Sequence, residues 1–318
     1  MAAPGACFPG ERGPVASLPF LDGGERRRGA PHAPGSRLLR SPPAAERGIR
    51  QSMPGFLTGP RLWDVVAGGY AHEIAPHFAK YGADALALAG AGAQSRVLDV
   101  ACGPGAVALA AACIGARAFA LDFSEGMISR LCKRAREEGV EVHAQLGDGT
   151  ALPFGDASFD VVLCMFALPF FSDRGKGLRE LVRVLKPGGA AVIGTWVAME
   201  RMPVLAEAYA VLGAALPDLP FGRADRPLCE LGQLRDEMAA AGFRDIEARE
   251  ITHSIEAISA DGLWRAMQRS TPPIRAAQEA LGEGWGDVHR RIGEMLSARW
   301  GEGPQRIPMT ANLARGRR

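Results

Sequence analysis

The sequence predicts an α/β fold in which a mainly parallel β-sheet carries helices on both faces. Between residues 96 and 196, short apolar segments alternate with amphipathic ones, as expected for strands separated by crossover helices. Several apolar segments end in aspartate or glycine, which is typical of strands that open into ligand-binding loops. The 318-residue chain is 47% hydrophobic and 23% charged, a composition typical of globular domains.

Five strands and three helices are predicted for this core. Residues 175–185 place Leu178, Leu181 and Leu185 on one helical face, and Pro187-Gly188-Gly189 ends that helix. Ser124 is placed to cap the preceding helix. The predicted strands are 96–101, 116–121, 140–145, 159–166 and 190–196, and the predicted helices are 106–114, 124–138 and 175–185.

The segments on either side of the core are predicted to be mainly helical. Residues 61–81 form a helix with a possible break before Pro76. After the core, helices are expected at 203–216, 231–241, 260–269, 274–281 and 287–300, with strands near 244–255 and at 307–314.

Residues 1–52 differ from the rest of the chain in composition. They contain eight Pro, eight Gly and eight Arg, and their apolar residues follow neither period 2 nor period 3.6. Such a segment buries too little apolar surface to offset its ordering entropy. We expect either a disordered extension or a reading frame extended upstream of a true start at Met53. A transit peptide fits less well, because serine is scarce and proline would break an amphipathic helix.

Charge, hydropathy and cysteine content exclude several classes of protein. The net charge is +2, but residues 1–52 hold eight Arg against four acidic residues, so the remainder carries −2 and lacks the electrostatic footprint of a nucleic-acid-binding protein. No run of about 18 apolar residues exists, so no membrane-spanning helix is predicted. The six cysteines have spacings that suit neither a zinc site nor a disulfide framework, so we expect no metal and a reducing, cytoplasmic compartment.

Glycines and polar residues follow the predicted strands, where an open α/β sheet binds its ligands. Gly103 and Gly105 allow a tight turn and close approach of a ligand. Asp122 can accept hydrogen bonds from a vicinal diol such as ribose, and Phe123 can lie against a base. Asp148 can accept from an exocyclic amine. Together they outline an adenosine-sized site, although each alone also fits an ordinary turn or helix-capping role.

Four segments, in this order, resemble the class I S-adenosylmethionine-dependent methyltransferases, in particular the small-molecule group that includes the ubiquinone and menaquinone C-methyltransferases. They are V-L-D-V-A-C-G-P-G (97–105), A-L-D-F-S-E-G-M-I (120–128), G-D-G-T-A-L-P-F-G-D-A-S-F-D (147–160) and L-V-R-V-L-K-P-G-G (181–189). The resemblance covers about a third of the chain. It implies a Rossmann-like, mostly parallel sheet of seven strands with an antiparallel last strand at 307–314, helices on both faces, and helical insertions near the C-terminus.

The resemblance also implies S-adenosylmethionine as cofactor and roles for individual residues. The glycine loop would hold the methionine part of the cofactor, and Asp122 would accept both ribose hydroxyls with Phe123 against adenine. Asp148 would meet the adenine amine beside the Gly149 backbone, and Met165 would line the methyl-donor side. The expected cofactor-binding residues are Asp99, Ala101, Gly103, Gly105, Asp122, Phe123, Met127, Asp148, Gly149 and Met165.

The chain departs from the family pattern at two places. Pro104 stands where the family often has Thr or Ser between the two glycines, which removes a backbone donor. Residues 166–171 read F-A-L-P-F-F where the quinone C-methyltransferases have a polar F-G-L-R-N-V stretch, so the sequence does not favour a quinone precursor as acceptor. The Asp/Asn-Pro-Pro-aromatic pattern of nucleic-acid amino-methyltransferases is also absent.

The acceptor pocket is expected from segments outside the core, at 201–226 and 263–273. Their apolar and aromatic side chains favour a small hydrophobic or aromatic acceptor, although helix packing would also explain them. The resemblance places the helix that carries Trp63 and Tyr70 as a lid on the cofactor. Trp264 and Met267 share a helix face that either packs on the core or lines the pocket. The candidate acceptor contacts are Tyr70, Trp264 and Met267.

No general base can be identified from the sequence, because the histidines at 72, 77, 143 and 253 are candidates only by residue type. The expected function is transfer of a methyl group from S-adenosylmethionine to a small, hydrophobic or aromatic acceptor. The expected organisation is one methyltransferase domain over 53–318, with a cofactor-binding core at 96–196 and acceptor-pocket helices plus a sixth strand at 200–305.

Two alternatives remain, an NAD-binding oxidoreductase that shares the glycine turn and a non-catalytic S-adenosylmethionine-binding protein. Asp99 before the turn and the later K-P-G-G element argue against the first alternative. The intact set of cofactor positions argues against the second.

Overall fold

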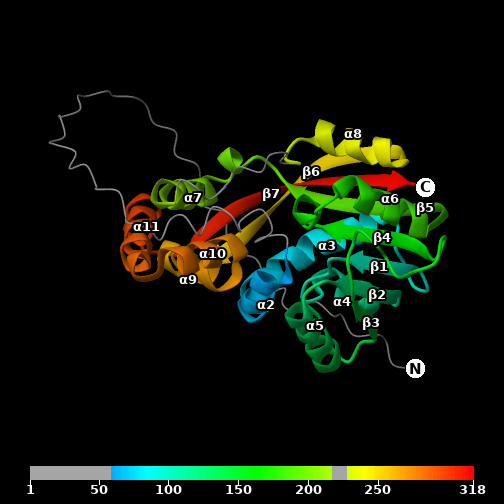
Figure 1. Ribbon diagram of the computed structural model, residues 1–318, viewed down its shortest axis with the longest axis horizontal. Coiled ribbons are helices and arrows are strands. Elements are labelled where there is room, and N and C mark those ends of the chain that lie inside the picture. Colours follow the sequence, from blue (N-terminus) through cyan, green and yellow to red (C-terminus); the bar gives the residue numbers. More distant parts are fainter. Residues whose placement is uncertain (1–58, 217–227) are drawn as a thin grey trace, which may run out of the picture. The chain divides into compact units, whose positions relative to one another are not determined.

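The computed structural model describes residues 59–216 and 228–318 (Figure 1). All of them lie in the second of two units, Ser52–Arg318, the first being Met1–Gln51. The predictions for residues 1–52, and for the part of the expected acceptor segment at 217–226, lie outside the described residues.

A seven-stranded sheet with the order β3-β2-β1-β4-β5-β7-β6 forms the centre of the second unit. Strands β1 to β5 pair in parallel, and β7 runs antiparallel to both β5 and β6, as the sequence predicts. The carboxyl ends of β1 to β5 therefore lie along one edge, where such sheets bind ligands. The strands are β1 (Arg96–Val100), β2 (Arg117–Asp122), β3 (Val142–Leu146), β4 (Phe159–Met165), β5 (Leu185–Trp196), β6 (Arg244–Ala257) and β7 (Gln305–Arg317).

Helices cover both faces of the sheet. Successive residues of a strand point to opposite faces, and the central strands carry apolar residues on both. On one face, α3 and α4 pack on the sheet through residues such as Val97, Val161 and Val192, and α5 joins them near β2. On the other face, α6 and α8 pack on residues such as Leu98, Val162 and Ile193. These helices are α3 (Ala75–Ala89), α4 (Ala106–Cys113), α5 (Glu125–Glu138), α6 (Arg174–Val184) and α8 (Leu231–Ala241).

A second group of helices, here called the helical cluster, consists of α7 (Pro203–Ala215), α9 (Ala260–Ser270), α10 (Pro272–Leu281) and α11 (Trp285–Trp300). They share a hydrophobic core with the ends of β6 and β7, through Ile255, Ile307 and Met309. Figure 1 shows that this cluster gathers at one end of β6 and β7, away from the C-terminus. Of the helices within the described ranges, none is both long and apolar enough to cross a membrane.

The segment before the core is helical, with the break that the sequence predicts. It consists of α2 (Pro60–Gly69), a π-helical turn η1 (Tyr70–Ile74) and α3, which continues eight residues past the predicted end at residue 81. Pro76 lies in the first turn of α3, where its missing N–H disturbs no helical hydrogen bond. The widened turn directly before it is the kind of irregularity that often marks a functional position.

The predicted start of the fifth strand at residue 190 is wrong. Strand β5 begins at Leu185, where it pairs with Phe159, and the K-P-G-G element lies inside it. A register shift between Phe159 and Val161 accommodates the extra residues, and Gly188 adopts a φ of +77° there. Proline and glycine are tolerated within a strand at such bulges, which is why they did not end the element.

Candidate functional site

The loop after β1 passes through three left-handed residues. Ala101, Gly103 and Gly105 have φ angles of +55°, +53° and +84°, a region that costs a non-glycine residue about 1–2 kcal/mol. A Cβ at Gly105 would lie 2.1 Å from Leu131 Cδ1, so packing also requires glycine there. A Cβ at Gly103 would meet only Tyr70, at 3.9 Å. Gly105 is therefore required by the fold, whereas Gly103 leaves room for a ligand.

Asp122, at the end of β2, has the geometry expected of a diol-binding carboxylate. It is 4% exposed, and its two oxygens accept hydrogen bonds from the Gly103 N–H (2.8 Å) and the Ser124 N–H (2.9 Å). Each oxygen keeps a further acceptor position, and a vicinal diol presents two donors, so the residue fits ribose. Burial raises the pKa of Asp122 to about 6 against the effect of these amides, so the carboxylate is mainly ionised at neutral pH.

Asp99, in the neighbouring strand, fixes the start of α4. It is buried, and its Oδ2 accepts a hydrogen bond from the Ala108 N–H at 3.0 Å. Burial raises the pKa of Asp99 to about 8, and the charge of Asp122 adds to this effect. This contact gives Asp99 a structural role, and its role in binding the cofactor stays a prediction.

Phe123 and Met127 follow Asp122 but have different surroundings. Met127 is 1% exposed and packs with Val66 and Ala67 of α2, whereas Phe123 is half-buried. Ser124 caps α5 as predicted, with its Oγ accepting from the Met127 N–H at 3.1 Å. Met127 therefore holds α2 against α5, and Phe123 keeps part of its surface available to a ligand.

Asp148 and Gly149 lie in the loop after β3. The carboxylate of Asp148 accepts from the N–H and the hydroxyl of Thr150, both at 2.8 Å. A Cβ at Gly149 would lie 2.5 Å from the ring of Phe171, so this loop packs directly on the loop after β4. The bonds to Thr150 fix the Asp148 carboxylate in position, and one acceptor position remains on each oxygen.

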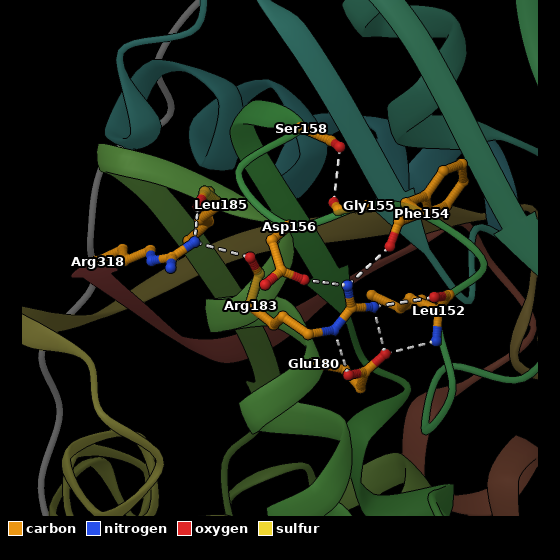
Figure 2. Close-up of polar contacts among 9 residues, drawn as sticks. All are labelled: Leu152, Phe154, Gly155, Asp156, Ser158, Glu180, Arg183, Leu185 and Arg318. Atoms are coloured by element: carbon orange, nitrogen blue, oxygen red, sulfur yellow. Dashed lines mark hydrogen bonds and ion pairs between the residues drawn. The ribbon is translucent and has the colours of Figure 1, made fainter.

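Two side chains of α6 hold this loop in place (Figure 2). Arg183 donates to the carbonyl oxygens of Leu152 and Phe154 at 3.0 and 2.8 Å. Glu180 accepts from the Leu152 N–H at 2.7 Å and from Arg183 at 2.6 and 2.8 Å. The hydrogen bond to Glu180 raises the pKa of Arg183, and a further bond to Asp156 adds to this effect. The loop that carries Asp148 is thus fixed by charge-assisted bonds.

The same network also includes the C-terminal residue. Arg318 donates to the carbonyl oxygens of Arg183 and Leu185, at 2.8 and 2.6 Å (Figure 2). Ser158 closes the other end of the loop by donating to the Gly155 carbonyl at 2.6 Å. The end of α6 and the start of β5 are thereby tied to β7.

The helix α2 and its π-helical continuation lie over the glycine loop. Tyr70, the first residue of the π-helical turn, is the nearest neighbour of the space at Gly103. Burial raises the pKa of the Tyr70 hydroxyl, and the charge of Asp122 raises it further. Trp63, one helix segment earlier, packs edge-on against Phe170 in the loop after β4, with ring centroids 5.3 Å apart. The segment therefore reaches from the loop after β1 to the loop after β4, and its role as a lid on the cofactor stays a prediction.

The end of β4 carries a strained aromatic residue. Phe166 has a φ of +62°, which is rare for a bulky side chain. Its ring stacks on Trp196 with centroids 4.1 Å apart and also contacts Phe78 and Tyr81. Met165, directly before it, is half-buried and lies against Gly194, where a Cβ would come within 2.6 Å of its Cε. The backbone turn thus places an aromatic group at the carboxyl ends of β4 and β5.

A cavity of about 1710 Å³ opens beside this aromatic group. Drug-sized ligands typically occupy about 300–1,000 Å³, so the cavity is large enough for such a molecule. Its lining is mainly apolar and includes Trp63, Tyr70, Phe166, Trp196, Met202, Tyr209 and Met267. Of the ten expected cofactor-binding residues, none is among the described residues that line it. The cavity is therefore distinct from the loops after β1, β2 and β3, although two of its lining residues, Tyr70 and Phe171, lie beside Gly103 and Gly149 of those loops.

Of the three candidate acceptor contacts, two line the cavity and one is buried in a helix core. Tyr70 and Met267 line the cavity. Trp264 is fully buried among the helices of the helical cluster, and its Nε1 donates to His289 Nδ1 at 3.0 Å. Thr271-Pro272-Pro273, after Trp264, does not form a loop: Pro272 begins α10, because proline suits the first turn of a helix. Trp264 therefore belongs to the core of that cluster.

The four candidate histidines also differ in location, because two line the cavity and two lie elsewhere. His72 and His77 line the cavity, and burial lowers the pKa of His77. His143 stacks on Phe119 in the sheet, and His253 bonds Asp84 at 2.6 Å between β6 and α3.

Several residues that shape the site were missed from the sequence. Asp64 of α2 contacts the start of α5, and Glu180 and Arg183 hold the loop after β3. Phe78 and Trp196 complete the aromatic group around Phe166. Their partners lie far away in the sequence, so no local pattern marks them. Arg183 alone lies in a segment that the sequence analysis singled out, L-V-R-V-L-K-P-G-G, but that segment did not indicate its partners.

Known proteins were compared with this chain. A family model described as a methyltransferase domain matches residues 98–193. A demethylmenaquinone methyltransferase of Clavibacter sepedonicus is 36% identical over 181 residues, which cover 52% of this chain and 72% of that protein. A malonyl-[acyl-carrier protein] O-methyltransferase of Pseudescherichia vulneris is 31% identical, over 68% of this chain and 84% of that protein.

Other matches are shorter or concern the structure. An uncharacterised protein of Mycobacterium tuberculosis is 36% identical over 41% of this chain, and the chain spans about half the length of that relative, 47%. The crystal structure of the YcgJ protein of Bacillus subtilis matches with a TM-score of 0.49 and 21% identity, over 75% of this chain and 98% of that chain.

The fold and the strand-end carboxylates define an α/β enzyme that binds a nucleoside cofactor. The sequence relatives make this specific: the chain belongs to the S-adenosylmethionine-dependent methyltransferases, and its cofactor is S-adenosylmethionine.

Proposed function

We propose that this enzyme methylates a small, hydrophobic or aromatic acceptor that binds in the cavity beside Phe166. The observation that carries the proposal is the apolar, aromatic lining of that cavity at the carboxyl ends of β4 and β5. The loops after β1, β2 and β3, residues 101–105, 123–124 and 147–158, form what we call the cofactor edge. The proposed division places the cofactor at this edge and the acceptor in the cavity next to it.

At the cofactor edge, the proposed roles follow the contacts already described. Asp122 would accept the ribose hydroxyls, with Phe123 beside the adenine and Asp148 toward its amine. The loop 101–105 would hold the methionine part, and Pro104 leaves that task to the neighbouring amides. When bound, S-adenosylmethionine supplies an electrophilic methyl group on a sulfonium.

The protein's own contribution to the reaction would be orientation and exclusion of water. Holding an acceptor in line for attack can remove about 7–11 kcal/mol of the barrier. Trp63, Tyr70 and Phe170 would help to keep water away from the edge, because Tyr70 lies beside Gly103 and the Trp63 ring packs edge-on against both Tyr70 and Phe170. We propose Tyr70 and Met267, which line the cavity, as acceptor contacts, and Met165 as part of the methyl-donor side.

His77 is the side chain we propose for handling a proton. It lines the cavity, and burial together with the charge of Lys80 lowers its pKa. The imidazole is therefore neutral near pH 7 and can take up the proton that an O–H or N–H acceptor loses.

Homology does not select the acceptor, because the relatives act on different molecules. The names of two of them specify demethylmenaquinone and malonyl-[acyl-carrier protein]. In this chain the loop after β4 reads F-A-L-P-F-F and contributes Phe166, Pro169, Phe170 and Phe171 to the cavity. This lining supports an apolar acceptor without a commitment to a quinone. The net charge of −2 outside residues 1–52 supports a small molecule over a nucleic acid.

We also propose a cytoplasmic location and a single methyltransferase domain over residues 53–318. Cys102, Cys132, Cys164 and Cys229 carry free thiols, which suits a reducing compartment. All described elements lie in the unit Ser52–Arg318, in which 96–196 would bind the cofactor and 200–305 the acceptor.

Two experiments test the proposal. Calorimetry with S-adenosylhomocysteine and with NAD should show binding of the first and none of the second, whereas the reverse would indicate an oxidoreductase. Incubation with isotope-labelled S-adenosylmethionine and a panel of phenols, naphthols and hydrophobic amines should then yield a labelled product that depends on His77. Cofactor binding without transfer to any member of a broad panel would favour a non-catalytic binding protein.

A further inference from the structure

The helix α2 is hydrogen-bonded to the first turn of α5 by one carboxylate. Asp64 Oδ1 accepts from the Ser124 hydroxyl at 2.5 Å and from the Gly126 N–H at 2.9 Å. The free N–H groups at a helix N-terminus favour a negative charge, so Asp64 suits this place. The contact joins residues 60 positions apart in the sequence.

The two helices approach each other closely at this point. A Cβ at Gly126 would lie 3.0 Å from the Asp64 Cα and 3.1 Å from its carbonyl oxygen. Met127 packs under the same helix with Val66 and Ala67. Glycine at 126 therefore lets the α2 backbone lie directly on the start of α5.

The bond from Asp64 is the outer end of a continuous chain of hydrogen bonds. Asp64 accepts from the hydroxyl of Ser124, the N–H of Ser124 donates to Asp122, and Asp122 also accepts from the N–H of Gly103. The chain thus links α2 to the ends of β1 and β2. Tyr70, directly after α2, is the side chain nearest to the space at Gly103, so this helical segment reaches the ends of β1 and β2 at two points, Asp64 and Tyr70.

We propose that Asp64 is a positioning residue for the cofactor, which fastens α2 across the cofactor edge and holds Ser124 and Asp122 in the geometry that receives the ribose. This inference rests on the proposed assignment of that edge. Asp64 acts through Ser124 and Asp122 and does not itself reach the ligand. Its loss should release α2, expose the edge to water, and speed the escape of bound cofactor or product.

The test compares Asp64→Ala, Asp64→Asn and Glu279→Gln in the full chain. Asparagine keeps the Oδ1 acceptor but removes the charge. Glu279→Gln is a matched control, because it weakens the 3.2 Å ion pair that joins Arg61 of the same helix to α10 and leaves the hydrogen bonds from Asp64 to α5 in place. The probe is S-adenosylhomocysteine, with affinity measured by calorimetry, dissociation by stopped-flow fluorescence, and hydrogen exchange followed over residues 60–69.

For Asp64→Ala we expect affinity for S-adenosylhomocysteine about tenfold lower, expressed mainly as faster dissociation. Bound S-adenosylhomocysteine should slow exchange over residues 60–69 in the wild type and in Glu279→Gln but not in Asp64→Ala. Asp64→Asn should recover part of the affinity. This partial recovery and the ligand-dependent exchange separate positioning from a general loss of stability.

The inference is overturned if Asp64→Ala binds and releases S-adenosylhomocysteine as the wild type does, or if it lowers the melting temperature without the ligand and changes affinity no more than Glu279→Gln. Failure of the wild type itself to bind S-adenosylhomocysteine would instead reject the assigned cofactor edge.

Discussion

The cofactor edge and the helical cluster differ in what determines their residues. At the edge, backbone geometry restricts the residue types. Residues 101, 103 and 105 adopt left-handed conformations, and the N–H groups of Gly103 and Ser124 donate to Asp122. In the helical cluster, side-chain packing restricts the residue types, because the helices share an apolar core that includes Trp264, Ile274 and Ile292. Few residue types can adopt a left-handed backbone conformation, whereas many apolar residue types can fill a position on a buried helix face.

This difference determines how much a residue type reveals about function in each region. Aspartates at the ends of strands, together with a glycine turn, serve few purposes besides ligand binding when they recur in a fixed order. An aromatic or apolar residue on a helix serves either packing or ligand contact. Trp264 and Met267 lie on the same helix but differ in role. Trp264 packs inside the helical cluster, whereas Met267 lines the cavity.

The largest effect is expected in the helical cluster. Trp264→Ala removes a fully buried side chain and its bond to His289, so the free energy of unfolding should fall by about 3–5 kcal/mol. The melting temperature should fall by about 10 °C or more, as read by calorimetry. Ile258→Ala is the control, because Ile258 is 88% exposed and its removal should change little. An unchanged melting temperature for Trp264→Ala would remove the contrast between the regions.

Most of the sheet could be predicted from the sequence because its signals are local. The cap at Ser124 and the aspartate that ends β2 are read from neighbouring residues, and both hold in the structure. The start of β5 could not be predicted, because pairing between Leu185 and Phe159 overrides the turn-forming K-P-G-G residues.

The positions of the polar residues and glycines at the proposed cofactor edge follow from the sequence, whereas the residues that support that edge could not be predicted. Asp122 and the glycines carry their chemistry in their own type and position. Asp64 and Arg183 act only through partners brought near by the fold, at distances of 60 and about 30 residues along the chain. A single sequence contains no signal for such pairs unless the topology is already known.

The next effect separates the two glycines of the cofactor edge. Gly105→Ala would force a Cβ against Leu131 in a left-handed conformation, which should cost about 2–4 kcal/mol of stability. Gly103→Ala should cost only about 1–2 kcal/mol of stability, for its conformation. It should nevertheless lower the affinity for S-adenosylhomocysteine, because its Cβ enters the space below Tyr70. Equal stability losses, measured by urea unfolding, would show that the loop does not distinguish packing from ligand space.

A third effect tests the proposed role of Asp122 in binding the ribose diol. Asp122→Ala should weaken binding of S-adenosylhomocysteine by at least tenfold, because two charge-assisted hydrogen bonds of about 1.5–3 kcal/mol each are lost. The melting temperature without ligand should change little, because removal of a buried charge offsets the loss of the carboxylate that accepts from the N–H groups of Gly103 and Ser124. Calorimetric titration decides the point, with Asp84→Ala as a control, because Asp84 of α3 bonds His253 of β6 and is not among the expected cofactor-binding residues. An unchanged dissociation constant would reject the role of Asp122.

The smallest effect concerns pH and the two buried carboxylates. The pKa of Asp99 is raised to about 8 and that of Asp122 to about 6, above the value of about 3.9 for an unfolded aspartate. The folded state therefore binds these protons more tightly than the unfolded state. The stability that they contribute is complete below about pH 4 and is lost as pH rises through about 6 and then about 8.

Without ligand, the melting temperature should consequently fall between about pH 6.5 and 8.5, and Asp99→Asn should fall less over that range. Asparagine can still accept the Ala108 N–H but does not ionise. Asp160→Asn is the matched control: the contacts of Asp160 with Lys186 and the Arg96 N–H lower its pKa, so its contribution disappears only in acid. If wild type and Asp99→Asn show parallel melting curves over this pH range, Asp99 is ionised in the fold. The neighbouring strands β1 and β2 would then hold two buried negative charges, those of Asp99 and Asp122, which would favour a cationic ligand.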